Sequence, residues 1–278
     1  MAVSGLRLDR NGAVLWVQVD RPQRQNRIDP VTNDLLRRTL LEADTDHTVR
    51  CIVVTATGDR HFCTGADLTA DRPADPKSLL PPSNEPAREA RPPLIDARSS
   101  VADFHALYRA YWELETPVVA AVNGTVAGAG LPLAFCADLV VAADHARFRS
   151  IWHEGGMSAH AGDPYFLPRI FPLHRLMEFA FTAEAFGADQ LLEWNVVNRV
   201  VPGSELRKAT AELAGRLAAG PTLAMGQTKR LYRRALESDM ATSFAEEAAA
   251  IVMLSPSKDR KEGMAAMAEG RRTDFTGR

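Results

Sequence analysis

Residues 117–130 read PVVAAVNGTVAGAG, an apolar run that leads into a turn of small residues. An apolar, β-branched run of this length is typical of a strand that is buried on both faces, as in a parallel sheet. The small residues at 127–130 leave main-chain amides uncovered where an apolar helix is predicted, over 131–136. Such a turn suits an anion or a developing oxyanion. It is not the dinucleotide-binding fingerprint, because GAGLPL at 128–133 lacks the third glycine.

A second turn of the same kind lies earlier in the chain. The run CIVVTA at 51–56 predicts another buried strand, and HFCTGADL at 61–68 follows it. Gly65 lets the backbone approach a ligand closely, so that the amide of Ala66 could point at an oxygen atom. Taken alone, this stretch is equally well explained as an ordinary loop. Two such turns on neighbouring parallel strands open at the same edge of a sheet, and together they predict one site.

Strand and helix signals alternate around these two turns. Two short apolar runs with Asn11-Gly12 between them predict a β-hairpin. Asp29-Pro30 predicts the start of a helix that runs to about residue 44. A further helix is expected over about 100–115, and DLVVAA at 138–143 predicts a third buried strand. Alternation of this kind is typical of an α/β fold with parallel strands.

The chain is expected to have two parts. Residues 1–201 form the predicted α/β body, and residues 202–278 form a predicted helical C-terminal region. Seven prolines between Pro73 and Pro93 indicate a long surface loop over 69–98, which we interpret as an insertion into the body. The helices expected in the C-terminal region cover residues 203–219, 221–237, 240–255 and 258–269.

The composition narrows the class of protein. The 278 residues include 33 Lys and Arg against 35 Asp and Glu, a net charge of −2, which argues against a general nucleic-acid or polybasic membrane binder. Three cysteines cannot build a disulfide framework and suit a reducing compartment. The N-terminus has no signal-peptide pattern, and no apolar run is long enough to span a bilayer. We therefore expect a cytoplasmic protein.

Eight short stretches follow one another in the order typical of one enzyme family. They are VRCIVVT (49–55), HFCTGADL (61–68), PVVAAVNG (117–124), AGAG (127–130), CADLV (136–140), GAD (187–189), VVNRVVP (196–202) and DFTGR (274–278). With them, the chain resembles the crotonase superfamily, also called the enoyl-CoA hydratase/isomerase family, over nearly its whole length. The resemblance implies a crotonase fold: an α/β spiral of ββα units with a helical C-terminal region that trimerises.

The resemblance also implies a ligand, an acyl-CoA whose thioester oxygen is held by two backbone amides. In this chain the two amides map to Ala66 and Ala129. CoA would enter as part of the substrate, with no separate cofactor and no metal, and the chain would assemble as a homotrimer or a dimer of trimers. The residues expected to contact the substrate are Arg24, Thr64, Gly65, Asp67, Leu68, Gly128, Trp152 and Phe275.

The chain departs from the family at the two positions that a hydratase needs. The family's first carboxylate lies two residues past the glycine cluster, where this chain has Pro132. The second lies four residues after Phe148, where this chain has Trp152. Neither side chain can act as a general acid or base, so the usual two-carboxylate addition of water is not expected.

Other ionisable side chains fill the segment in which the family's acid and base residues cluster. His153, Glu154, His160 and Asp163 all lie there. We expect His153 or His160 to act as the base, oriented by Asp163 or Glu154, because the unperturbed pKa of imidazole lies close to neutral pH. The β-diketone hydrolase branch resembles this pattern, with a histidine where His153 lies and an aspartate one residue away from Asp163.

The tryptophan–histidine pair also resembles the aryl-CoA dehalogenase branch. That branch has a carboxylate nucleophile eight residues past the tryptophan, where this chain has His160, so halide displacement is not expected. It also has a histidine twelve residues before the proline of the next strand, and counting back from Pro117 gives His105 as a further catalytic candidate. The alternative for His105 is a packed histidine on its helix. A metal held by His153, His160 and Asp163 is considered and not adopted.

Three functions follow from these observations. The first is a crotonase-type enzyme that stabilises an enolate or oxyanion of an acyl-CoA and uses a histidine base for isomerisation, C–C hydrolysis or a variant hydration. The second is a non-catalytic acyl-CoA-binding protein, which the missing carboxylates favour. The third is a CoA-independent β-diketone hydrolase, because the basic residues before the first helix, Arg24 and Arg27, match the family only loosely.

Overall fold

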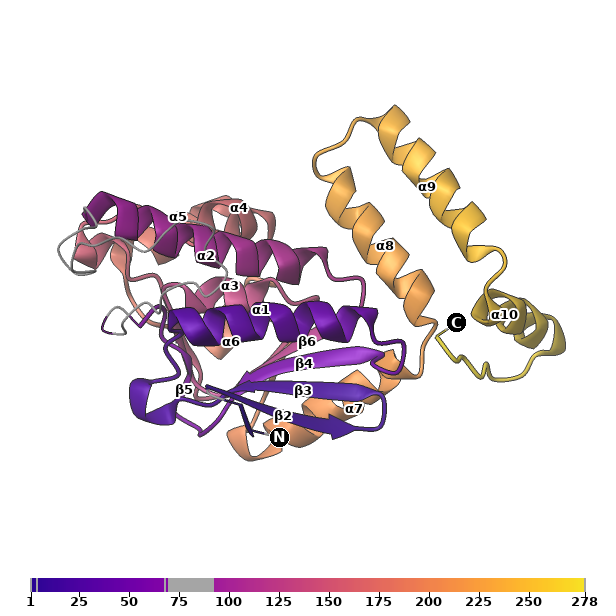
Figure 1. Cartoon of the computed structure of the whole chain (residues 1–278), viewed down its shortest axis with the longest axis horizontal. Coiled ribbons are helices and arrows are strands. Elements are labelled where there is room, and N and C mark those ends of the chain that lie inside the picture. The colour runs from indigo at the N-terminus through magenta and orange to yellow at the C-terminus, as the bar shows by residue number, and fades with distance from the viewer. Residues whose placement is uncertain (1, 4, 68, 70–92, 278) are drawn as a thin grey trace, which may run out of the picture.

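The computed structural model describes residues 2–3, 5–67, 69 and 93–277 (Figure 1). Within them, seven strands form one sheet in the order β1-β2-β3-β4-β6-β8-β11. The first three strands are antiparallel neighbours, and from β3 onward each pair is parallel. The strands are β1 (Ala2–Val3), β2 (Leu6–Asn11), β3 (Val14–Val19), β4 (Cys51–Ala56), β6 (Val118–Val122), β8 (Leu139–Ala143) and β11 (Arg199–Val201). The predicted hairpin and the three predicted buried strands are confirmed.

A second, smaller sheet brings the two small-residue turns together. Its order is β10-β9-β7-β5, with β5 (His61–Cys63), β7 (Thr125–Ala127), β9 (Arg147–Arg149) and β10 (Phe186–Gly187). β4, β6 and β8 are each followed closely by a strand of this sheet, so two strands precede each turn. Since β5 and β7 pair in parallel, the turns that follow them lie at the same edge.

Both faces of the large sheet are buried, which explains the nearly continuous apolar runs of its parallel strands. On one face Val17, Ile52 and Val54 belong to a core that also contains side chains of α1 and α2. On the other face Trp16 and Val53 pack against α7. Figure 1 shows the same layering, with α1 and α2 above the sheet and α7 below it.

The helices of the body begin where local signals place them, with one exception. α1 (Pro30–Thr45) starts at Asp29, whose side chain accepts a hydrogen bond from the Thr32 amide, as predicted. α2 (Pro93–Glu113) begins earlier than expected, so the predicted loop over 69–98 is wrong for its last residues, while residues 70–92 lie outside the described part. A proline fits the first turn of a helix, because its missing N–H has no partner there.

Short helices complete the body. They are α3 (Gly130–Phe135), α4 (Asp163–Phe166), α5 (Leu173–Thr182) and α6 (Ala188–Glu193), with 3₁₀ turns η1 (Pro22–Arg24), η2 (His153–Gly155), η3 (Leu167–Arg169) and η4 (Gly203–Glu205).

The C-terminal region is helical, as predicted. It contains α7 (Leu206–Ala218), α8 (Thr222–Ala235), α9 (Met240–Leu254) and α10 (Lys258–Glu269). α7 packs on the sheet, whereas α8, α9 and α10 extend away from it (Figure 1). No helix within the described residues is both long enough and apolar enough to cross a membrane.

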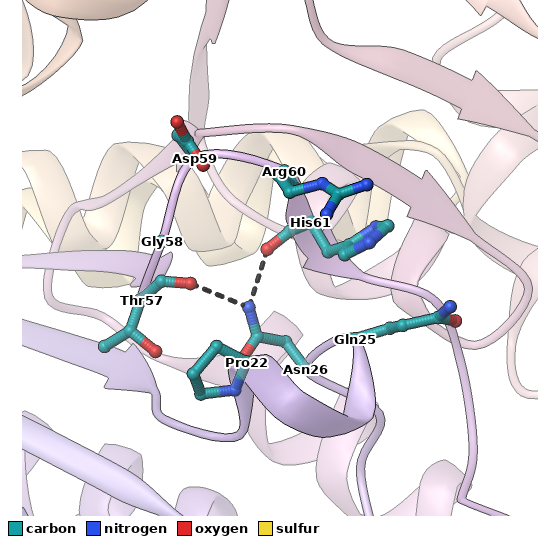
Figure 2. A pocket seen from close by; sticks show the side chains of 8 residues that line it. All are labelled: Pro22, Gln25, Asn26, Thr57, Gly58, Asp59, Arg60 and His61. Carbon is teal, nitrogen blue, oxygen red and sulfur yellow. Dashed lines mark hydrogen bonds between the residues drawn. The ribbon is translucent and has the colours of Figure 1, made fainter.

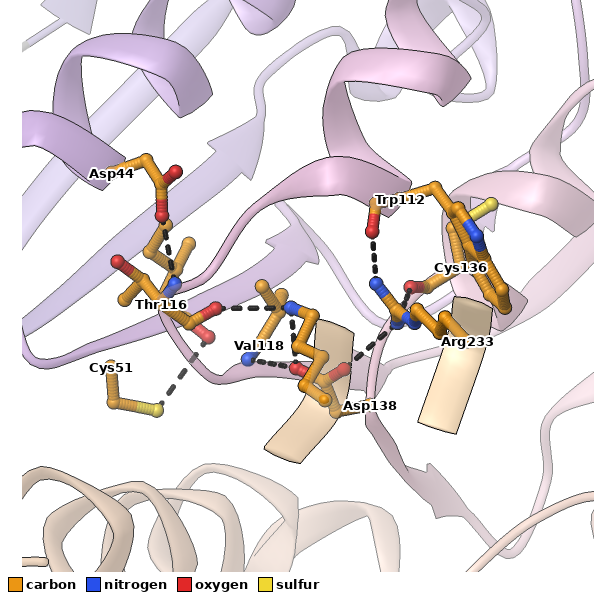
Figure 3. A network of polar contacts seen from close by, with 10 residues as sticks. Asp44, Cys51, Trp112, Thr116, Val118, Cys136, Asp138 and Arg233 are labelled. Atoms are coloured by element: carbon orange, nitrogen blue, oxygen red, sulfur yellow. Dashed lines mark hydrogen bonds and ion pairs between the residues drawn. The ribbon is translucent and has the colours of Figure 1, made fainter. Parts of the chain in front are cut away.

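A half-buried carboxylate joins α8 to the body (Figure 3). Asp138, just before β8, pairs with Lys229 and Arg233 of α8, each at 2.8 Å. It also accepts a hydrogen bond from the Val118 amide at 2.7 Å. The Arg233 guanidinium lies 3.8 Å from the centre of the Trp112 ring. One carboxylate therefore ties two strands of the sheet to the first of the outlying helices.

Candidate functional site

The two small-residue turns touch through their backbones. Gly65 has a φ of +108°, which L side chains rarely adopt. A methyl group built on Gly65 would lie 3.5 Å from the Ala129 nitrogen and 3.5 Å from the Ala127 carbonyl oxygen. The first turn therefore lies against the Ala129 amide of the second turn.

The backbone pairing of the first turn orients the Ala66 amide. The Ile28 N–H donates to the Gly65 carbonyl, and the Asp67 N–H donates to the Ile28 carbonyl, both at 2.9 Å. In a parallel bridge of this kind, the N–H of the central residue, Ala66, points away from Ile28. Among the described residues, neither the Ala66 N–H nor the Ala129 N–H donates to a protein acceptor. Two donors are thus available for a ligand oxygen.

Apolar side chains form a wall beside these donors. Gly128, which precedes Ala129, has a φ of +51°. A methyl group built on Gly128 would lie 3.2 Å from Ile151 Cδ1 and 3.6 Å from Trp152 Cη2. From the other side, the Tyr108 hydroxyl of α2 donates to the Ala129 carbonyl. The turn is therefore held between β9, the residues after it, and α2.

The Asp163 carboxyl bonds this wall and not a histidine ring, although the Asp163 amide donates to the His160 carbonyl at 3.2 Å. The Trp152 indole Nε1 donates to Asp163 Oδ2 at 2.6 Å. Asp163 is 1% exposed, and its burial raises the pKa of the carboxyl to about 8, although the hydrogen bond from Trp152 opposes the shift. Glu154 pairs with Arg149 instead. Among the described residues, neither carboxylate is therefore hydrogen-bonded to a histidine ring.

His160 lies against the same indole. The centre of its ring is 3.8 Å from that of Trp152, and its Nδ1 is 2.9 Å from the Ser158 carbonyl oxygen. Because a carbonyl can only accept, the Nδ1–H donates to it, and Nε2 is the unprotonated nitrogen of the neutral ring. His160 can thus accept a proton through Nε2.

The other two histidines are exposed. His153 is exposed in η2, and its ring meets Phe181 of α5 edge-on at 5.5 Å between centres. His105 is exposed on α2, one turn before Tyr108. The structure therefore brings His160 to Trp152 and leaves His153 and His105 at the surface of the described part.

Most of the expected substrate contacts lie in the two turns. The Thr64 hydroxyl donates to the Gln25 carbonyl at 3.3 Å, and buried Asp67 pairs with Arg21 at 2.9 Å, so Asp67 supports the turn. Arg24 is exposed in η1. Leu68 lies outside the described residues.

Phe275 is not brought to this site within one chain. Its ring lies near Gly263 of α10, and its carbonyl accepts a hydrogen bond from Arg50 at 2.9 Å. Figure 1 shows the C-terminus beside α10 and β5 at the opposite end of the molecule. A contact between Phe275 and a ligand at the Ala66 turn would need a second copy of the chain.

A pocket of about 350 Å³, lined mainly by polar residues, lies behind the first turn and was not predicted (Figure 2). Asn26 closes one side, because its amide donates to the Thr57 and His61 carbonyls at 3.0 and 2.6 Å. Burial, together with the positive charges of Arg60 and Arg27, lowers the pKa of His61. The residues that line the pocket are Pro22, Gln25, Asn26, Thr57, Gly58, Asp59, Arg60 and His61. The Arg60-His61 pair just before the first turn was an available sequence signal.

Comparisons with known proteins show what the whole chain is similar to. The family model described as enoyl-CoA hydratase/isomerase matches residues 9–78 and 87–278. A carnitinyl-CoA dehydratase from Escherichia coli O157:H7 is 32% identical over 277 residues, 98% of each chain. A 1,2-epoxyphenylacetyl-CoA isomerase from Escherichia coli K12 is 32% identical over 95% of each. The crystal structure of an enoyl-CoA hydratase from Bacillus anthracis superposes with a TM-score of 0.86 at 24% identity, covering 99% of this chain and 100% of that one, which supports the fold.

Proposed function

Because the chain belongs to the enoyl-CoA hydratase/isomerase family, within the crotonase superfamily, we propose that it stabilises the enolate of an acyl-CoA thioester. The observation that carries the proposal is the contact between the two turns, which sets the Gly65 backbone against the Ala129 amide. The carnitinyl-CoA dehydratase and the epoxyphenylacetyl-CoA isomerase are named for CoA thioesters, which supports this ligand class.

In the proposed chemistry, the Ala66 and Ala129 N–H groups donate to the thioester oxygen. As a proton leaves the α-carbon, its electron pair forms the enolate double bond and negative charge develops on that oxygen. Removing one such donor from an enzyme typically costs about 2.7–4 kcal/mol of transition-state stabilisation. The chemistry uses side chains and main-chain groups of this chain, and CoA takes part only as a portion of the substrate.

The proton acceptor in this scheme is Nε2 of His160. Its ring is held by the Ser158 carbonyl on one side and by the Trp152 indole on its face. When the acyl chain has a double bond between its β- and γ-carbons, the enolate is conjugated with it. The imidazolium then returns the proton to the γ-carbon and the double bond moves to the α,β position, which gives an isomerisation. C–C hydrolysis by a His153–Asp163 pair is not favoured, because Asp163 is bonded to Trp152.

We place the phosphate groups of CoA near the pocket behind the first turn. Arg27 and Arg60 are close enough to act on His61, and exposed Arg24 lies in the adjoining 3₁₀ turn. Guanidinium groups bind phosphate oxygens through several hydrogen bonds at once. Gln25 borders both this pocket and Thr64 of the first turn, so one ligand could reach from the phosphates to the thioester.

The test is exchange of the α-proton of acyl-CoA esters in heavy water, followed by mass spectrometry. The wild-type protein is expected to exchange a suitable ester, and His160→Gln is expected to lower kcat about 100-fold, because it removes the base. His153→Gln is the matched control and should stay within about twofold of wild type.

Two outcomes would contradict the scheme. If the wild type bound a panel of CoA esters tightly but exchanged none of them, a non-catalytic acyl-CoA-binding protein would be favoured. The lack of acid–base groups at Pro132 and Trp152 supports that alternative. Equal exchange by His160→Gln and wild type would show that His160 is not the base. The proposal would then keep only the two amides as donors to the thioester oxygen.

We also propose that the chain forms homotrimers through its outlying helices. On α9, Met240, Phe244 and Ile251 recur at helical spacing and are 71%, 61% and 54% exposed. A row of exposed large apolar side chains is unusual for a monomer and typical of an interaction surface. In a trimer, the Phe275 that contacts the ligand would come from a second copy of the chain. We further propose the cytoplasm as its compartment, which suits three buried free cysteines.

Sedimentation measurements test the assembly. The wild-type protein is expected to sediment at three times the chain mass, or six if trimers pair. The double variant Phe244→Glu with Ile251→Glu should sediment as a monomer, because it places charge in the apolar row. Glu247→Gln, on the same helix, is the control and should keep the wild-type mass. A monomeric wild type would refute the trimer.

A further inference from the structure

Asp163 is a buried carboxyl that the proposed chemistry does not use. Its Oδ2 accepts the Trp152 indole N–H at 2.6 Å. Its Oδ1 is buried and has no hydrogen-bond partner among the described residues. Burying a polar atom without a hydrogen-bond partner costs free energy, so an unpaired carboxyl oxygen in a packed site needs an explanation.

Within the described part of the chain, no positive charge faces Asp163 to offset that cost. The titratable groups that face it are Tyr108 from α2 and Cys136 at the end of α3. Both are fully buried, and burial raises the pKa of each well above its ordinary value, so both are neutral. The Asp163 carboxyl is therefore held by one hydrogen bond and by packing among the described residues.

The indole of Trp152 connects Asp163 to the oxyanion turn. Its pyrrole edge donates to Asp163, and the far edge of its six-membered ring, at Cη2, lies near Gly128. Gly128 precedes Ala129, one of the two proposed oxyanion donors. The face of the same indole carries the ring of His160, the proposed base. Both proposed catalytic features therefore contact one side chain, and Asp163 holds that side chain at its other edge.

We propose that Asp163 is a positioning residue that acts through Trp152. Its hydrogen bond fixes the indole, which lies beside the oxyanion turn and supports the ring of His160. This inference rests on the proposed function. Without an acceptor at residue 163, the indole N–H would be buried unpaired, and the ring would be free to turn away. A small displacement of a base or of an oxyanion donor lowers the rate of the chemical step more than it lowers affinity.

Variants at residues 152 and 163 test the proposal. Asp163→Leu keeps the branching of the side chain at Cγ, in a somewhat larger volume, and removes the acceptor; it is expected to lower kcat for α-proton exchange about tenfold, with KM within about twofold of wild type. Asp163→Asn keeps an acceptor for the indole and should restore kcat to within about threefold of wild type. Trp152→Phe removes the donor together with part of the indole, so it should slow exchange at least as much as Asp163→Leu.

The double variant tests whether the two residues act through their shared bond. Because Asp163→Leu and Trp152→Phe remove the same hydrogen bond, combining them should slow exchange no more than the slower single variant does. Multiplied single effects in the double variant would overturn the proposal, and so would a kcat for Asp163→Leu equal to that of wild type.

A second readout needs no substrate. The Trp152 indole ¹H–¹⁵N resonance, assigned by its loss in Trp152→Phe, should be protected from solvent exchange in the wild type and in Asp163→Asn. In Asp163→Leu it should shift and exchange faster. An unchanged resonance in Asp163→Leu would refute the bond itself. A wild type with the expected resonances that exchanges no acyl-CoA would instead refute the proposed function, and with it the catalytic purpose of the bond.

Discussion

Asp138→Ala is expected to lower the free energy of unfolding by about 3–5 kcal/mol, the range seen when one partner of a buried ion pair is removed. Asp138 has two cationic partners, Lys229 and Arg233, whose side chains are only 10% and 14% exposed. Burial already lowers the pKa of Lys229, and Asp138 is the main group that opposes this shift. Without Asp138, two desolvated cations, Lys229 and Arg233, would lie one helical turn apart on α8 with no opposite charge between them.

The measurement is urea unfolding at neutral pH, and the chain offers a matched control. Asp34 also has two arginine partners, Arg37 and Arg38, but its side chain is 51% exposed. Asp34→Ala is expected to change the free energy of unfolding by less than about 1 kcal/mol, since solvent screens exposed pairs. Equal losses in Asp138→Ala and Asp34→Ala would show that burial of the Asp138 cluster contributes nothing.

Asp163→Asn is expected to make stability less dependent on pH and to stabilise the protein at neutral pH. Burial raises the pKa of Asp163 to about 8 in the folded state, whereas the unfolded chain has an ordinary carboxyl. Between about pH 4 and pH 8, the unfolded state has lost this proton and the folded state keeps it. The folded state then binds more protons, so stability falls as pH rises, by about 1.4 kcal/mol per pH unit.

The expected difference is large enough to measure directly. From pH 4 to pH 7, wild type should lose on the order of 4 kcal/mol relative to Asp163→Asn, because asparagine cannot ionise. Urea unfolding of both proteins at several pH values gives the two slopes. Asp34→Asn, which changes an exposed carboxyl, should follow wild type. Parallel pH profiles for wild type and Asp163→Asn would show that the Asp163 carboxyl is ionised in the folded state.

These two carboxylates differ in what their burial achieves. Asp138 is compensated by two cations and joins helix α8 to the sheet. Asp163 has a single neutral donor and lowers stability at neutral pH. Residues that cost stability without a structural return are often found at functional sites. Of the two carboxylates, Asp163 is therefore the one to test for a role in catalysis.

Local patterns in the sequence were sufficient for most of the fold. Asp29-Pro30 marks the start of α1 by a side-chain cap that lies within four residues. The run 51–56 is buried at every position, which its unbroken apolar character predicts. The start of α2 at Pro93 was missed, because prolines near the end of a loop and a proline in a first helical turn look alike in sequence.

The candidate site was only partly predictable. Family motifs located Ala66 and Ala129, and the parallel pairing of β5 and β7 accounts for their meeting. The partners of the ionisable residues were not predictable in the same way. Asp163 and Trp152 are 11 residues apart, and whether such residues touch depends on the path of the chain through η2 and the turn that follows.

By itself, the sequence determined the hairpin, the three buried strands β4, β6 and β8, the start of α1, the two glycine turns and the absence of acid–base groups at Pro132 and Trp152. These depend on neighbouring residues, through side-chain periodicity, proline and glycine geometry and residue chemistry. Only the tertiary structure decided that Asp163 bonds Trp152 and that His160 lies on the same indole. Such contacts depend on the packing of several elements at once, which no local pattern encodes.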